Sequence, residues 1–579
     1  MSSLAARGSL LLVTAILAAC AGHREVDTTA GPAAERAAAK DDLSEIIVTS
    51  SRRSEGRLAR RENAAERKLE KMPSAPQVAY PSSAPLMAIT SMPQQQAVNT
   101  ENYDHLSDNA VHLASEQPVS TFSIDVDTGA YANVRRFLNA GQLPPQDAVR
   151  IEEMINYFDY DYAVPSDRKA PFKVSTELAG APWNQQALLL KIGIKGFEVA
   201  AAERPAANLV FLIDVSGSMQ SPDKLPLLKN AFRLLTAQLA ERDRVSIVVY
   251  AGSTGVVLEP TSGKEKHKIL AALDRLEAGG STNGAAGIEQ AYALARSMSI
   301  PGGINRVVLA TDGDFNVGVV SFEALVDRAE RERASGVALT TLGFGTGNYN
   351  DKLLERLADA GNGNYAYVDN LAEARKVLVS ELSSTLFTIA SDVKIQVEFN
   401  PATVQEYRLI GYENRMLARE DFNNDKVDAG EIGAGHRVTA LYEIIPVGGR
   451  GHVEPLRYGE QSATKAKAGE LAHLRLRYKQ PSSDTSQLLE YPIEAKSALP
   501  LAKTSDDFRF AASVAAFGQV LRGGKYVGGF GYEDIVSLAR GGLSKDNEGY
   551  RREFISLVKL ADSLQPQAER LSEVSGEKR

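Results

Sequence analysis

Three side chains with oxygen atoms alternate along a polar turn that directly follows an apolar run. They are Asp214, Ser216 and Ser218, in the motif Asp-Val-Ser-Gly-Ser. Two further oxygen-bearing residues stand in later loops, Thr282 in Gly-Gly-Ser-Thr-Asn and Asp312 in Ala-Thr-Asp-Gly-Asp. Carboxylate and hydroxyl oxygens suit a hard divalent cation such as Mg²⁺, which takes octahedral oxygen coordination. The sequence therefore predicts a five-oxygen cation site built from three separate segments.

The charge of this candidate site indicates what it is for. Only Asp214 and Asp312 carry charge, and the three hydroxyl groups are neutral donors. A bound Mg²⁺, Mn²⁺ or Ca²⁺ would keep much of its positive field and some open or water-filled positions. A carboxylate from an Asp or Glu of a partner protein could complete its coordination. The site is therefore interpreted as an adhesive contact rather than a metal store.

The segments around the candidate site predict alternating strands and helices. Residues 209–213 form a continuous apolar run, typical of a parallel strand covered on both faces. Apolar residues at three- and four-residue spacings follow over 225–239 and predict a helix. Further strands are expected at 245–250, 255–258, 307–310, 337–344 and 365–368, and further helices at 269–276, 288–295, 322–334, 351–359 and 371–386.

This alternation predicts an α/β fold with a doubly wound, mostly parallel sheet. Ligands of such sheets bind beyond the carboxyl ends of the strands, near a switch in strand order. Asp214 and Asp312 each follow the end of a predicted strand. The predicted fold and the predicted site therefore agree.

The five residues resemble the metal-ion-dependent adhesion site of von Willebrand factor type A domains, which are Rossmann-like. The family pattern is Asp-x-Ser-x-Ser, then a distant Thr and a distant Asp, and every position is matched. The resemblance implies that Ser216, Ser218 and Thr282 bind the ion directly, while Asp214 and Asp312 act partly through water. Related domains can switch affinity by moving their last helix, which makes the predicted helix over 371–386 a candidate transmitter.

The flanks of this domain predict one β-sandwich interrupted by the α/β insertion. Alternating patterns predict strands at 172–178 and 187–194 before the insertion, and at 393–399, 407–412, 438–445, 472–478 and 488–494 after it. Helices are expected at 131–139 and 150–158, and the C-terminal tail is predicted helical over 506–521, 532–539 and 549–564.

Several phrases outside the α/β domain resemble a bacterial lipoprotein family often called YfbK-like. Examples are Phe-Ser-Ile-Asp-Val-Asp-Thr-Gly-Ala-Tyr ending at Tyr131 and Arg-Ile-Glu-Glu-Met-Ile-Asn-Tyr-Phe ending at Phe158. The resemblance covers nearly everything after residue 105, and it implies an architecture rather than an activity. The expected domains are a lipoprotein signal peptide (1–19), a disordered tether (20–105), an N-terminal flanking α+β segment (106–207), a von Willebrand factor type A domain (208–386), a β-rich flanking domain (387–500) and a helical C-terminal region (501–579).

The single cysteine predicts a membrane anchor. A short basic start and an apolar stretch over residues 8–19 end in Leu-Ala-Ala-Cys20. This resembles a bacterial lipoprotein signal peptide, which implies cleavage before Cys20 and lipidation of that residue. Ala21 resembles a signal for sorting to the outer membrane. The expected location is the bacterial cell envelope, with the chain anchored in the outer membrane and facing the periplasm or the surface.

One fragment of the tether offers a second contact. The residues Glu45, Ile46, Ile47, Val48 and Thr49 lie in a segment that resembles the TonB-box-like peptides of outer-membrane receptors. Such a peptide adds as a strand to the sheet edge of an energy-coupling protein. A chance β-prone tetrad in a polar tail is the interpretation favoured over such a contact.

Composition and the remaining motifs exclude other functions. The formal net charge of −8, without a basic face interleaved with aromatics, argues against nucleic acid as a partner. Ser221-Pro-Asp-Lys224 fits the Ser-x-x-Lys motif of penicillin-binding enzymes but lacks its companion motifs. Residues 420–428 alternate polar side chains like a calcium loop but lack the turn glycine and the closing Glu. No catalytic constellation emerges, so the protein is not expected to be an enzyme.

Two alternatives to the adhesive function stay open. The metal could be purely structural, holding three loops of an envelope scaffold together. It could also be catalytic, as in a metal-dependent hydrolase, with Asp314 or Glu289 as the nearest candidate bases.

Overall fold

The computed structural model describes residues 100–124, 127–166, 169–200, 202–281, 284–313, 321–453, 469–481, 483–543 and 546–565. The chain divides into compact units at 1–94 and 95–579, and the described residues all belong to the second. The predicted signal peptide, Cys20, the segment from Glu45 to Thr49, Thr282 and Asp314 lie outside the described residues. Within the described ranges, no helix is both long and apolar enough to cross a membrane.

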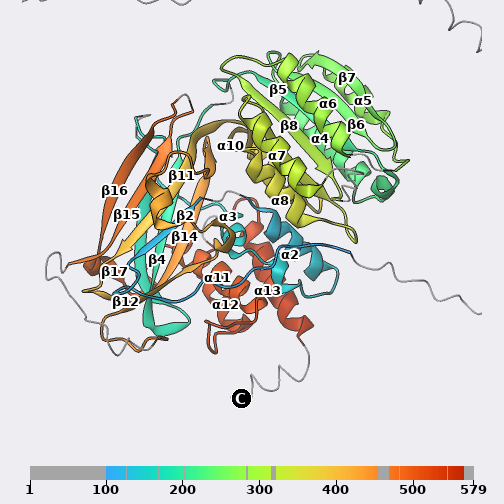
Figure 1. Ribbon diagram of the computed structural model, residues 1–579. Coiled ribbons are helices and arrows are strands. Elements are labelled where there is room, and N and C mark those ends of the chain that lie inside the picture. Colours follow the sequence, from blue (N-terminus) through green and yellow to red (C-terminus); the bar gives the residue numbers. More distant parts are fainter. Residues whose placement is uncertain are drawn as a thin grey trace, which may run out of the picture. The chain divides into compact units, whose positions relative to one another are not determined.

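A six-stranded sheet forms the central α/β domain (Figure 1). Its strand order is β10-β9-β8-β5-β6-β7, and only the edge strand β7 runs antiparallel to its neighbour. The strands are β5 (Ala207–Asp214), β6 (Arg244–Tyr250), β7 (Thr254–Ser262), β8 (Ile304–Thr311), β9 (Ala338–Phe344) and β10 (Tyr365–Val368). Every residue of β5 is buried, as its unbroken apolar run predicts.

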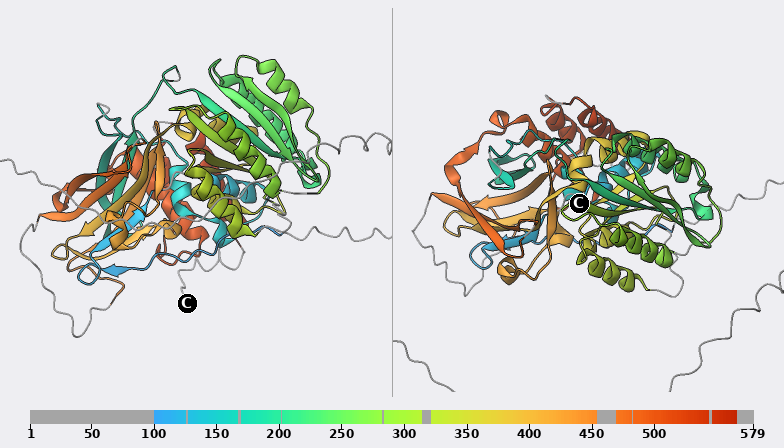
Figure 2. Two further views of the ribbon diagram at one scale, coloured as in Figure 1. Left: turned by 45° about the horizontal axis from the view of Figure 1, so that its top comes forward. Right: turned by 90° about the horizontal axis from the view of Figure 1, so that it is seen from above.

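Helices cover both faces of this sheet, as the right-hand view of Figure 2 shows. Alternate residues of β5 belong to different cores: Phe211 packs with α4 and α5, and Leu212 packs with α6, α7 and α8. The helices are α4 (Leu225–Gln238), α5 (Lys266–Asp274), α6 (Gly284–Ser297), α7 (Phe322–Arg333), α8 (Asp351–Ala360), α9 (Leu371–Arg375) and α10 (Leu382–Leu386). The predicted doubly wound α/β fold is confirmed.

The last helix of this domain differs from its prediction. A continuous helix was expected over 371–386, but the π-helical turn η4 (Lys376–Ser380) separates α9 from α10. The N–H of Glu381 bonds the carbonyl of Lys376, five residues back. The Lys376 ammonium donates to Glu381 at 2.7 Å and lies 4.3 Å from the centre of the Tyr157 ring, so tertiary partners hold the wider turn in place.

The flanking strands form two further sheets, which share one apolar core as a sandwich. One has the order β1-β12-β14-β4-β3-β17, and the other has the order β13-β11-β15-β16 with β2 also paired to β11. The strands are β1 (His112–Leu113), β2 (Val119–Ser123), β3 (Phe172–Ala181), β4 (Asn184–Gly196), β11 (Thr388–Phe399), β12 (Val404–Ile410), β13 (Gly430–Gly433), β14 (Arg437–Pro446), β15 (Glu470–Lys479), β16 (Ser486–Glu494) and β17 (Ala498–Leu499).

Pairing across the insertion completes both sheets. β14 pairs with β4, which precedes the α/β domain, and β11 pairs with β2. The predicted sandwich is therefore present, with four short strands that the sequence analysis did not anticipate: β1, β2, β13 and β17. Strands of two to five residues carry too little alternation to stand out from a loop.

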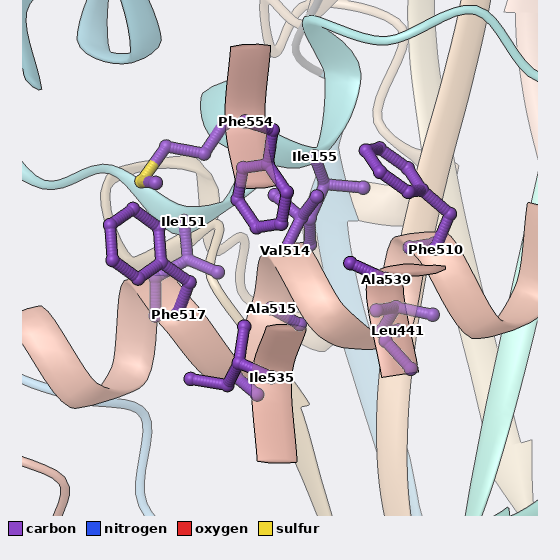
Figure 3. Close-up of a cluster of buried hydrophobic side chains, with 14 of the residues drawn as sticks. Ile151, Ile155, Leu441, Phe510, Val514, Ala515, Phe517, Ile535, Ala539 and Phe554 are labelled. Carbon is purple, nitrogen blue, oxygen red and sulfur yellow. The ribbon is translucent and has the colours of Figure 1, made fainter. Parts of the chain in front are cut away.

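The C-terminal helices pack on the N-terminal flank rather than standing as a separate tail. The helices are α2 (Gly129–Asn139), α3 (Ile151–Asn156), α11 (Asp506–Leu521), α12 (Tyr532–Arg540) and α13 (Tyr550–Leu564). Figure 3 shows Ile151 and Ile155 of α3 among Phe510 and Phe517 of α11 and Phe554 of α13. Segments about 350 residues apart in the sequence thus share one buried core.

Candidate metal-binding site

The two aspartates predicted as ligands lie where adjacent parallel strands end. Asp214 is the last residue of β5, and Asp312 directly follows β8, which pairs with β5 in parallel up to Ile213 and Ala310. The Thr311 hydroxyl donates to Asp214 Oδ2 at 2.8 Å. Because the neighbours of β5 are β8 on one side and β6 on the other, this edge is the switch point of the sheet.

The two serines form a tight turn over Asp214. The Ser216 N–H donates to Asp214 Oδ1 at 2.9 Å, and the hydroxyl oxygens of Ser216 and Ser218 lie 3.0 Å apart. Ser216 is the N-cap of the short 3₁₀ helix η3 (Gly217–Gln220). Ser216 is buried, whereas Ser218 is exposed. The serine turn therefore joins the buried carboxylate to the protein surface.

Backbone hydrogen bonds bring the third predicted segment to the serine turn. The Gly217 N–H donates to the Gly280 carbonyl at 3.0 Å, and the Gly279 N–H donates to the Val215 carbonyl at 2.8 Å. Gly280 has a φ of 86°, a conformation that favours glycine. Thr282 comes two residues later and lies outside the described residues, so its place in the site stays a prediction.

Asp312 is held by two residues that the sequence analysis did not assign to the site. The Lys224 ammonium and the Asn348 amide donate to Asp312 Oδ2 at 2.9 and 3.1 Å. The same ammonium donates to Asn348 Oδ1 at 2.8 Å. The Ser-x-x-Lys lysine thus bonds a carboxylate of the candidate metal site. One sequence signal existed, because a lysine at the N-cap of α4 is unfavourable to the helix dipole and needs another reason.

Burial and like charge perturb Asp214. Burial raises the pKa of the Asp214 carboxyl to about 6, with a further contribution from the negative charge of Asp312, although hydrogen bonds from Ser216 and Thr311 oppose the rise. The Tyr250 hydroxyl also donates to Asp214 Oδ2 at 3.2 Å. Two carboxylates close enough to repel each other, beside two hydroxyl groups, form a donor set that fits a hard cation.

A strap of residues 100–104 lies along the loop that carries Asn348. The N–H groups of Thr100 and Asn102 donate to the carbonyls of Gly347 and Tyr349 at 2.8 and 2.9 Å. Glu101 accepts from the Gly347 N–H at 2.9 Å and pairs with Arg136 of α2. The first described residues of the chain therefore fix a loop that contacts the candidate site.

The structure also shows the contacts of the other residues considered as metal ligands or catalytic bases. Among the described residues, no group of three or more His, Cys, Asp or Glu side chains is placed to hold a metal. The Lys394 ammonium donates to the carbonyls of Asp421 and Asn424 at 3.1 and 2.6 Å, so a lysine occupies the calcium-like segment. Glu289 is exposed and pairs with Arg328 of α7 at 3.3 Å.

Comparisons with known proteins agree with this architecture. The family description "von Willebrand factor type A domain" matches residues 208–380, "von Willebrand factor" matches 97–191, and "Uncharacterized protein YfbK, C-terminal" matches 384–564. The uncharacterized protein YfbK of Escherichia coli is 49% identical over 473 residues, which cover 80% of this chain and 82% of that protein. The chain belongs to the YfbK family. These descriptions name no biochemical activity, so the functional argument rests on the site.

More distant matches are confined to parts of the architecture. The uncharacterized protein sll0103 of Synechocystis is 31% identical over 203 residues, which cover 34% of this chain and 45% of that protein. A solved von Willebrand factor type A protein from Catenulispora acidiphila has a TM-score of 0.38 and 15% identity, and the match covers 69% of this chain and 91% of that one. Membership of a family built around this domain suggests a protein-interaction module rather than an enzyme.

Proposed function

We propose that this protein is a lipid-anchored module of the cell envelope that captures a partner protein through a divalent cation. The cation is Mg²⁺, for which Mn²⁺ or Ca²⁺ can substitute, and the partner presents an Asp or Glu side chain. The observation that carries the proposal is the convergence of Asp214, Ser216, Ser218 and Asp312 beyond the ends of β5 and β8.

The donor set explains why the site would bind a partner. Ser216, Ser218 and Thr282 would hold the cation directly, and Asp214 and Asp312 would hold it partly through water. When bound, the cation supplies a positive field that attracts a carboxylate. Ser218 is exposed, so a side chain of another protein can reach that side of the site. Asp214 and Asp312 are fully buried, so their carboxylates would help to retain a bound cation.

The anchor and the tether extend the proposal to location. Lipidation of Cys20 would hold the chain at a membrane, proposed here to be the outer membrane facing the periplasm or the surface. Residues 20–99 would let the folded part work away from that membrane, since a flexible chain of about 80 residues spans roughly 50 Å. The predicted tether reached residue 105, but residues 100–104 form the strap of the folded unit. The segment from Glu45 to Thr49 would offer a strand to a TonB-like partner.

Titration calorimetry of the full chain with MgCl₂ and MnCl₂ tests the metal site first. The wild type is expected to bind one ion, and Asp214→Ala and Thr282→Ala are expected to lose that binding. Asp327→Ala is the matched control, because Asp327 is an exposed carboxylate on α7 of the same domain. Equal binding by wild type and Asp214→Ala would refute the site.

Capture from envelope extract then tests the adhesive role. A partner should be retained by the wild type with Mg²⁺, released by chelator, and absent with Asp214→Ala. A metal that raises the unfolding temperature while no chelator-sensitive partner is found would favour the scaffold alternative. A radiolabelled palmitate feed with a Cys20→Ala control tests the anchor separately.

A further inference from the structure

Lys224 is built into the candidate metal site rather than lying near it by chance. Lys224 is only 6% exposed, although lysine is rarely buried without a partner. The ammonium bonds Asp312 and Asn348. The loop after β9 makes room for the lysine stem at Gly345, where an added Cβ would lie 2.2 Å from Lys224 Cε and where φ is +77°. A residue with a side chain at position 345 would therefore displace the Lys224 side chain.

The charges around the cation position follow from this arrangement. Asp214 and Asp312 supply two negative charges, and Lys224 supplies one positive charge within hydrogen-bond distance of Asp312. The hydroxyl groups of Ser216 and Ser218 supply none. A divalent cation would therefore make the site neutral without the lysine, but positive by one charge with it. At separations of a few ångströms inside a protein, one charge strongly changes the affinity for an ion.

We propose that Lys224 sets the charge of the site, so that the cation is held weakly in the free protein and tightly only when an anionic group joins it. The lysine competes with the cation for Asp312, and it leaves the loaded site with a positive charge that one carboxylate neutralises. This inference rests on the proposed function and adds a specificity-determining residue to it. Cation and carboxylate then bind cooperatively, and each raises the affinity for the other by the same factor.

Mn²⁺ titration of the full-length Lys224→Met and Lys224→Gln variants tests the inference. Removing the charge is expected to tighten Mn²⁺ binding by at least about tenfold at low salt. Gln keeps a hydrogen-bond donor for Asp312, so it preserves the local structure if Met does not. The matched control is Lys229→Met on the same helix, because the Lys229 ammonium bonds the carbonyls of Asp274 and Leu276 instead. That control should bind Mn²⁺ as the wild type does.

Replacing chloride by acetate at constant ionic strength tests the cooperativity with a simple carboxylate. Acetate should tighten Mn²⁺ binding by the wild type more than it does for Lys224→Gln. Thermal unfolding gives a second readout. In chelator, Lys224→Gln should unfold at a lower temperature than the wild type, because Asp312 loses its cationic partner. The rise in unfolding temperature on adding Mg²⁺ should be larger in the variant than in the wild type.

The outcomes separate this inference from the proposed function. Equal or weaker Mn²⁺ binding by both variants, with a folded chain, overturns the role of Lys224 while leaving the metal site intact. Binding by the variants but not by the wild type in chloride supports the lysine as a competitor. If acetate then fails to restore Mn²⁺ binding by the wild type, both the cooperativity and cation-dependent capture by the natural protein are overturned. Absence of binding in the wild type and in both variants overturns both proposals.

Discussion

Two groups of buried carboxylates in the α/β domain are compensated in opposite ways. At the candidate metal site, the Lys224 ammonium bonds Asp312, whereas Asp214 accepts only from neutral donors, among them the Ser216 N–H and the Thr311 hydroxyl. In the second group, which we call the flank joint, carboxylates in and beside α8 and α9 form ion pairs with two arginines of the N-terminal flank. The flank joint consists of Arg135, Arg150 and their partners Glu153, Asp351, Glu355, Asp369 and Glu373.

The guanidinium groups of the flank joint are surrounded by negative charge. Arg150 bonds both oxygens of Asp351 and also bonds Glu153. Arg135 donates to Asp369 at 2.8 Å and to Glu373 at 2.7 Å. Burial alone would lower the pKa of Arg150, but its carboxylate partners raise it well above the ordinary value. Planar guanidinium donors satisfy several carboxylates at once, so this group is a structural connection.

The difference teaches how to distinguish a binding site from a structural ion network. In the flank joint, two rigid guanidinium groups from another part of the chain each bond several carboxylates, although burial still raises the pKa of Glu355 to about 7. Charge at the metal site is matched only in part, since the Lys224 ammonium contacts Asp312 and burial raises the pKa of Asp214. Negative charge that is only partly compensated, beside the exposed Ser218, indicates a place where a cationic ligand can bind.

Breaking the flank joint should have the largest effect. Arg150→Met would leave Asp351 and Glu153 buried without their cation, and we expect a loss of about 3–5 kcal/mol in the free energy of unfolding. Urea denaturation followed by circular dichroism measures it. Arg328→Met is the control, because its partly exposed pair with Glu289 should contribute under about 1 kcal/mol. A loss for Arg150→Met as small as the control's would contradict the comparison.

Removing the charge at the metal site should have the reverse effect on stability. Asp214→Asn should weaken Mg²⁺ binding by about 10- to 100-fold. In chelator at pH 8, the same change should stabilise the chain by about 1–3 kcal/mol, because a buried and repelled carboxylate is gone. Calorimetry and urea denaturation measure the two effects. Destabilisation in chelator would show that Asp214 is structural, like the carboxylates of the flank joint.

The pH dependence sharpens the contrast. The pKa of Asp214 is about 6 in the folded chain against 3.8 ordinarily, so the folded state binds more protons between these values. Its contribution to stability in chelator should therefore fall as pH rises from about 4 to 6. Mg²⁺ affinity should fall about tenfold per pH unit below about 6, because the proton competes with the cation. Titrations at several pH values measure this, and a profile unchanged by Asp214→Asn would contradict the assignment.

The strap should give the smallest effect. Glu101→Gln removes the charge that binds the Gly347 N–H and Arg136, and so loosens the loop that carries Asn348. We expect a change of about 0.5 kcal/mol in Mg²⁺ binding free energy, measured by calorimetry. Glu116→Gln, an exposed carboxylate of the same flank, is the control. Identical affinities for both variants would show that the strap does not reach the metal site.

Much of the candidate site follows from local sequence patterns. The apolar run ending at Ile213 determines a buried strand, so the residues after it must lie at the sheet edge, where ligands bind. The same reasoning places Asp312 after β8. The strand and helix order of the central domain was predicted for the same reason, because hydrophobic periodicity reports burial directly.

Only the tertiary structure decided which distant residues become partners. Lys224 and Asp312 are 88 residues apart, and Arg150 and Asp351 are 201 apart. β2 pairs with β11 across the inserted domain. The Lys376 ammonium lies over the Tyr157 ring, in the π-helical turn that interrupts the expected continuous helix. Periodicity records how far each residue is from solvent, but not which charged group faces it across a core. The sequence by itself therefore determined the strands that end at the candidate metal site, and the packing of the chain decided which charged groups surround that site.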